Sequence, residues 1–70
     1  MELFCRNKFE AALKIKGASM TELADYLKLN RATLYKKVAQ QSDFTRAEIQ
    51  SIKTFLNLSA EEVMDIFYAQ

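Results

Sequence analysis

Apolar residues recur every three or four positions along most of the chain, as they do on the buried face of an α-helix. The segment with Ile49, Ile52 and Leu56 is a clear example. No segment alternates apolar and polar residues in the manner of a half-buried strand. The pattern therefore predicts an all-α fold with five short helices, at residues 3–16, 20–27, 31–40, 46–56 and 60–68.

Polar residues that cap backbone N–H groups mark the predicted helix starts. A Ser or Thr followed three residues later by Glu satisfies two N–H donors that have no partner inside the helix. This capping box occurs at Ser19 and Glu22, at Thr45 and Glu48, and at Ser59 and Glu62. Apolar pairs that bracket the caps indicate the same starts: Leu29 with Leu34, Phe44 with Ile49, and Leu58 with Val63. Asn30 is a further N-cap residue, and Gly17 is a typical helix stop.

The length and composition limit the class of protein. A chain of 70 residues supports one hydrophobic core, so we expect residues 1–70 to form a single domain. Half of the residues are hydrophobic and the net charge is +1, which is typical of a folded chain rather than a disordered one. The chain opens without a basic segment, and its longest apolar run has four residues. We therefore expect neither a signal peptide nor a membrane association.

The residue inventory argues against enzyme and metal chemistry. The chain has no His and a single cysteine, Cys5, so it lacks the ligands of a zinc site and the pairs of a disulfide framework. A reducing, cytoplasmic setting fits this usage. Cys5 is either a small apolar residue or a reactive thiol, and the first reading is simpler. The single glycine, Gly17, excludes a Gly-rich phosphate loop. We expect no catalytic residues, no metal and no cofactor.

The segment between Asp25 and Asp43 contains no carboxylate. Only about three residues join the second and third predicted helices, which forces the two into a tight corner. On the third helix, Leu34 and Val38 share one face by helical spacing. The opposite face has short side chains followed by polar ones. That face and its flanks contain Ala32, Thr33, Tyr35, Lys36, Lys37 and Gln40. Such a helix can enter a DNA major groove, although a merely solvated surface has the same composition.

Residues Met20-Thr21-Glu22-Leu23-Ala24-Asp25-Tyr26-Leu27-Lys28-Leu29-Asn30-Arg31-Ala32-Thr33-Leu34-Tyr35-Lys36-Lys37 resemble the helix-turn-helix of the lambda-type repressor and Cro family, also called the xenobiotic-response-element family. Ala24 matches the small residue that lets the two helices approach, and Leu29 and Leu34 match the apolar positions that lock the turn. The remaining chain is similar to small phage proteins of the Cro type. The resemblance implies a compact five-helix domain that binds a double-stranded DNA operator as a homodimer, in the cytoplasm of a bacterium or a phage-infected host, without a small-molecule ligand.

The resemblance also assigns roles by position. It implies base contacts at Arg31, Ala32, Thr33 and Lys36. It implies phosphate contacts at Ser19, Met20, Thr21, Asn30, Tyr35, Lys37, Gln40 and Gln41, although Tyr35 could instead pack against a neighbouring helix. The apolar end of the last predicted helix makes Phe67 and Tyr68 candidates for a dimer interface.

Two positions depart from the family pattern. The family usually has Gly where this chain has Lys28, and a left-handed backbone costs a non-Gly residue on the order of 1 kcal/mol. Either Lys28 accepts that strain or the turn differs. Met20 stands where Gln is frequent, which weakens the expected contact there.

The distribution of charge separates the two halves of the chain. Residues 1–41 contain eight Lys or Arg and four Asp or Glu, for a net charge of +4, whereas residues 42–70 have a net charge of −3. This asymmetry favours a DNA-binding regulator with a basic face. The alternative is a protein-interaction module with the same fold, such as an antirepressor.

Overall fold

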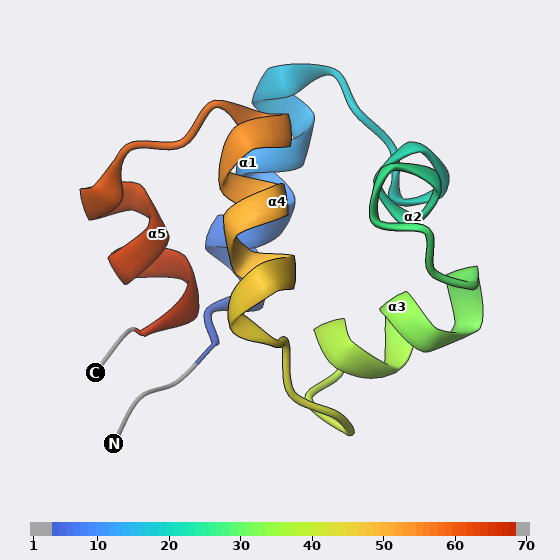
Figure 1. Cartoon of the computed structure of the whole chain (residues 1–70). Helices are drawn as coiled ribbons and strands as arrows, with labels where there is room; N and C mark the ends of the chain where they lie inside the picture. Colours follow the sequence, from blue (N-terminus) through green and yellow to red (C-terminus); the bar gives the residue numbers. More distant parts are fainter. Residues whose placement is uncertain (1–3, 69–70) are drawn as a thin grey trace.

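The computed structural model describes residues 4–68, which form five α-helices and no strand (Figure 1). The helices are α1 (Arg6–Lys16), α2 (Met20–Leu27), α3 (Arg31–Val38), α4 (Arg46–Leu56) and α5 (Ala60–Phe67). The all-α prediction with five helices is confirmed. The first helix begins later than predicted, because Cys5 has an extended backbone; residue 3 lies outside the described range.

Side-chain caps start four of the helices, as the sequence predicts. Ser19, Thr45 and Ser59 each accept a hydrogen bond from the backbone N–H three residues later, at 3.1 Å. In return, the Glu at that position accepts one from the N–H of the cap residue. Asn30 caps α3 through Oδ1, which accepts from the N–H of Ala32 at 2.8 Å. Each cap stabilises its helix by about 1 kcal/mol.

A left-handed residue directly follows three of the helices, and only one of the three is glycine. Gly17 (φ 75°) follows α1 as predicted, Lys28 (φ 58°) follows α2, and Asn57 (φ 54°) follows α4. After each of them, the next N–H bonds the carbonyl five residues back, as from Leu29 to Ala24 at 2.9 Å. This is the Schellman motif, which satisfies carbonyl groups at a helix end. Lys28 therefore accepts the left-handed backbone.

The same motif shortens α3 relative to the prediction. Gln40 has a φ of 64°, and the N–H of Gln41 bonds the carbonyl of Lys36 at 2.8 Å. The helix ends at Val38 rather than at residue 40. The last helix ends at Phe67, one residue before the predicted end.

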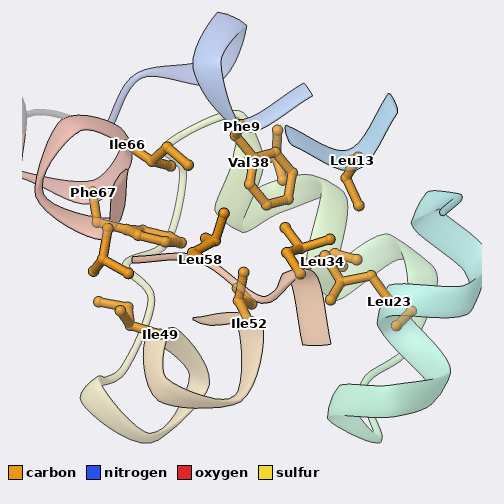
Figure 2. Packing of buried hydrophobic residues seen from close by; sticks show 13 residues of the cluster. Phe9, Leu13, Leu23, Leu34, Val38, Ile49, Ile52, Leu58, Ile66 and Phe67 are labelled. Carbon is orange, nitrogen blue, oxygen red and sulfur yellow. The ribbon is translucent and has the colours of Figure 1, made fainter. Parts of the chain in front are cut away.

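The hydrophobic core lies where the inner faces of the helices meet (Figure 2). Phe9, Leu23, Leu34 and Ile52 are fully buried and come from α1, α2, α3 and α4. Helix α4 packs against α1, α2 and α5, whereas α3 packs mainly against α2. Helix α3 therefore lies at the edge of the fold. In residues 4–68, no helix has both the length and the apolar composition that crossing a membrane requires.

Candidate nucleic-acid interface

Helix α3 has one buried face and one exposed face. Leu34 and Val38 are buried in the core, with exposures of 0% and 2%. The four predicted base-contacting residues are all exposed: Arg31, Ala32, Thr33 and Lys36. An α-helix with its side chains is about 10–12 Å across, close to the width of about 12 Å of a DNA major groove. The outer face is thus free for a ligand of groove dimensions.

The connection between α2 and α3 adds exposed polar groups beside this face. Lys28 and Asn30 are exposed. Oδ1 of Asn30 caps the helix, so its side-chain amide nitrogen remains as a hydrogen-bond donor. At the start of α2, Ser19 and Thr21 are exposed, and the Ser19 hydroxyl can still donate a hydrogen bond.

Met20 does not share this exposed position. Its side chain is half-buried and packs against the core. Only part of this side chain is therefore left on the surface for the predicted phosphate contact at Met20. A flexible thioether suits a partly buried position of this kind.

Lys37 is the largest departure from the predicted site, because its side chain points inward. The residue is 8% exposed. Its Nζ donates to the backbone carbonyl of Asp43 at 2.9 Å and pairs with Oε1 of Glu48 at 3.1 Å. Its ammonium group is thus engaged inside the fold, and the prediction of a phosphate contact at Lys37 is wrong. Helical spacing alone does not show this burial, because Lys37 and the exposed Arg31 both lie about 60° around the axis from Leu34.

The Lys37 ion pair ties α3 to α4. Glu48 Oε1 also accepts the N–H of Thr45 at 2.8 Å, so the same carboxylate caps α4 and binds the ammonium group. The carbonyl of Asp43 adds the connecting segment to the network. Three parts of the chain therefore meet at Nζ of Lys37, which holds the last turn of α3 against the start of α4. Lys37 is a positioning residue of the candidate interface.

The other predicted phosphate contacts lie on the surface. Tyr35 is 45% exposed, and its ring stacks on no other aromatic ring of residues 4–68. Gln40 and Gln41 are exposed in the turn after α3. These three side chains flank the outer face of α3, in agreement with an outward-facing role.

The predicted dimer residues lie largely inside the protein. Phe67 is 6% exposed, and its ring meets that of Phe44 edge to face, with centroids 5.4 Å apart. Phe4 packs on both rings, at 5.3 and 5.6 Å. The prediction for Phe67 is wrong, because its ring is enclosed in an aromatic cluster with Phe4 and Phe44. Tyr68 is half-buried against the same cluster.

Exposed cations lie on α3 and on the turn before it, and exposed acids lie on α5. Lys28, Arg31 and Lys36 are exposed around α2 and α3, and within the described chain none of them forms an ion pair. The acids of α5 are exposed as well: Glu61, Glu62 and Asp65. Figure 1 shows α3 and α5 on opposite sides of α4. The outer face of α3 itself has cations and no acid, whereas the acids of α5 lie beside Lys8 and Lys16 of α1.

In residues 4–68, no three His, Cys, Asp or Glu side chains lie close enough to hold a metal ion. No family model, curated protein or solved structure matches the chain. The exposed face of α3 is consequently the feature from which a function can be argued.

Proposed function

We propose that the chain is a sequence-specific DNA-binding transcriptional regulator of the repressor or Cro type. In this proposal, α2 and α3 form a helix-turn-helix, and α3 docks in the major groove of an operator. The single observation that carries it is the outer face of α3, which exposes Arg31, Ala32, Thr33 and Lys36 with no carboxylate between Asp25 and Asp43. The resemblance of residues 20–37 to repressors of the lambda type supports the same function and favours a phage or prophage origin.

Each exposed side chain of α3 has a specific part in this docking. Ala32 is short enough for the helix to approach the base edges. Arg31 can bind guanine through two hydrogen bonds, which discriminates against other bases by about 1–3 kcal/mol. Thr33 and Lys36 offer a hydroxyl and an ammonium group to neighbouring bases or phosphates.

Phosphate contacts come from the residues around that face. The exposed donors are Ser19, Thr21, Asn30, Tyr35, Gln40 and Gln41. Lys28 adds a cation in the turn. Contacts of this kind orient the protein on the duplex without reading its sequence. Lys37 supports the interface from inside, because its ion pair fixes the last turn of α3.

The small number of exposed cations sets the expected salt dependence. Lys28, Arg31 and Lys36 are the exposed cations of α2, α3 and their connection. Each phosphate that they neutralise contributes about −0.9 to the slope of log affinity against log salt. The expected slope is therefore about −3 for each chain on DNA.

Selection of bound duplexes from a random pool at moderate salt tests the proposal directly. We expect enrichment of a short consensus sequence. With that duplex, Lys36→Glu should abolish binding while the far-UV circular dichroism stays unchanged, because the exposed side chain of Lys36 forms no hydrogen bond or ion pair within residues 4–68. Lys14→Glu, the same change at an exposed position on α1, is the matched control and should retain binding. No enrichment, or undiminished binding by Lys36→Glu, would contradict the proposal.

A further inference from the structure

A hollow of about 420 Å³ lies where the end of α3 meets the start of α4. Gln40 and Ser42 of the connecting segment line it, together with Arg46, the first residue of α4, and all three are exposed. The buried side chain of Lys37 and rings of the aromatic cluster form further parts of its wall. We term this space the α3–α4 hollow. Polar groups from α3, α4 and their connection thus surround one space beside the candidate DNA-binding helix.

The guanidinium group of Arg46 has no partner in the part of the chain that the structure describes. Within residues 4–68, the ion pairs are Arg6 with Glu10 and Lys37 with Glu48. The side chain of Arg46 also takes no part in the side-chain hydrogen bonds of these residues. A guanidinium group has five N–H donors, so Arg46 can bind an acceptor outside the chain.

The position of Arg46 on α4 does not favour the fold. As the first helical residue, it places a cation at the positive end of the helix dipole. Arg6 holds the same position on α1, which also has 11 residues, but it pairs with Glu10 one turn later at 3.3 Å. One turn after Arg46 stands Gln50, which has no charge. A cation that opposes the dipole and lacks a partner does not stabilise the helix by its charge, which favours a role in binding.

We propose that the α3–α4 hollow receives a backbone phosphate of DNA and that Arg46 binds it. This inference rests on the proposed function, and it extends the interface from α3 to the first turn of α4. A guanidinium group binds two phosphate oxygens at once, and the amide of Gln40 and the hydroxyl of Ser42 can donate to the same phosphate. With this further cation, the expected slope of log affinity against log salt becomes about −4 for each chain.

The tertiary structure brings Arg46 to the interface. In the sequence it lies ten positions after Lys36 and on another helix. The ion pair between Lys37 and Glu48 joins the last turn of α3 to the first turn of α4, and so places Arg46 beside the end of α3. Helical spacing along α3 therefore does not predict this contact.

Among the described residues that line the α3–α4 hollow, Asp43 is the one carboxylate. It is exposed, and its carboxylate forms no ion pair in the described chain. A phosphate in the hollow is attracted by Arg46 and repelled by Asp43. Removal of the two charges should therefore change DNA affinity in opposite directions, whereas a cationic ligand would reverse both signs.

Binding to a selected duplex tests the role of Arg46. Arg46→Gln should bind about tenfold more weakly, because it loses a charge-assisted contact with phosphate, and its salt slope should fall by about 0.9 for each chain. Arg6→Gln is the matched control, since it removes the same side chain from the same position of another helix, and its affinity and slope should be unchanged. The Tm of Arg46→Gln should not fall below that of the wild type, because the deleted charge opposes the α4 dipole.

Asp43→Asn tests the sign of the charge that the hollow attracts. It keeps the backbone carbonyl that binds Lys37, and it should bind the duplex about threefold more tightly at low salt. The gain should shrink as salt screens the repulsion.

Replacement of single DNA phosphates by neutral methylphosphonates locates the contact. At one phosphate the replacement should weaken binding by the wild type about tenfold. The same replacement should have no effect on Arg46→Gln, because that variant has already lost the partner of this phosphate.

The inference is overturned if Arg46→Gln binds the duplex as tightly as Arg6→Gln does, if Asp43→Asn binds more weakly than the wild type, or if no methylphosphonate position distinguishes Arg46→Gln from the wild type. A failure of the proposed function differs from these results. In that case no duplex is enriched, or Lys36→Glu binds without loss, and no DNA contact of α3 remains to be extended. A loss in Lys36→Glu without any loss in Arg46→Gln would leave α3 on DNA and the hollow outside the interface.

Discussion

Removal of the Lys37 ammonium group should loosen the attachment of α3 to α4. The substitution Lys37→Met keeps the buried aliphatic stem and deletes the hydrogen bond to Asp43 O and the ion pair with Glu48. Both charged side chains are largely shielded from water, at 10% and 16% exposure. Charge-assisted hydrogen bonds of this kind contribute about 1.5–3 kcal/mol. Because Glu48 still caps α4 through Thr45 N–H, we expect a loss near the middle, about 2 kcal/mol.

Substitution of the partner carboxylate, Glu48, should lower the free energy of unfolding by more than substitution of Lys37. Glu48→Gln preserves a side-chain oxygen for the Thr45 cap but leaves the ammonium group of Lys37 without a counter-ion in an enclosed site. Unpaired charges that are shielded from water destabilise a protein by about 3 kcal/mol or more. The double variant Lys37→Met/Glu48→Gln removes both charges. Its loss in the free energy of unfolding should be smaller than the sum of the losses in the two single variants. The expected coupling is about 1–2 kcal/mol.

Urea denaturation of the four proteins measures this coupling. For a domain of this size, a loss of 2 kcal/mol should also lower the Tm by about 8–16 °C. Additive effects within about 0.5 kcal/mol would show that the two side chains do not act together. A Lys37→Met protein as stable as the wild type would refute the reasoning altogether.

Further predictions concern the exposed cations and the helix ends. On a selected duplex, Lys36→Met should reduce the salt slope of binding by about 0.9 for each chain, whereas Lys37→Met should leave the slope unchanged; a lower slope for both would place Lys37 on DNA. Lys28→Gly should raise the free energy of unfolding by about 0.5–1 kcal/mol, because glycine adopts a φ of 58° without strain. Gly17→Ala should lower the free energy of unfolding by about 1 kcal/mol. The cause is backbone strain alone, since an added Cβ at Gly17 meets no atom within 4 Å. Ser59→Ala should cost about 1 kcal/mol by loss of the α5 cap, and thermal unfolding that shows no change would contradict that role.

The helix starts could be predicted because the interactions that form them are local. Ser19, Thr45 and Ser59 each bond a group three residues away, so a short window of sequence contains both partners. The helix ends were less predictable. Gly17 signals a left-handed residue by its type, but Lys28 and Gln40 adopt the same backbone without any such signal. In both cases the next N–H bonds the carbonyl five residues back, a closure that lysine and glutamine do not signal by residue type.

The outer face of α3 was also foreseeable, since the apolar spacing of Leu34 and Val38 orients the helix relative to a core. The exposure of Arg31, Ala32, Thr33 and Lys36 follows from that orientation. The flanking positions were not foreseeable with the same certainty. A long side chain at the border of two faces can turn either way, depending on what lies opposite.

The sequence by itself thus determined the helical class, the capped starts and the side of α3 that meets solvent, because these depend on residues within about one or two helical turns of each other. Only the tertiary structure decided that the side chains of Lys37 and Phe67 are buried. The carboxylate that draws Lys37 inward comes from α4, and the rings that enclose Phe67 come from the N-terminal segment and the loop before α4. The same holds for Ile15, whose exposure depends on how α1 and α5 are placed. Burial is a property of which helix faces meet, and those faces are brought together only when the chain folds.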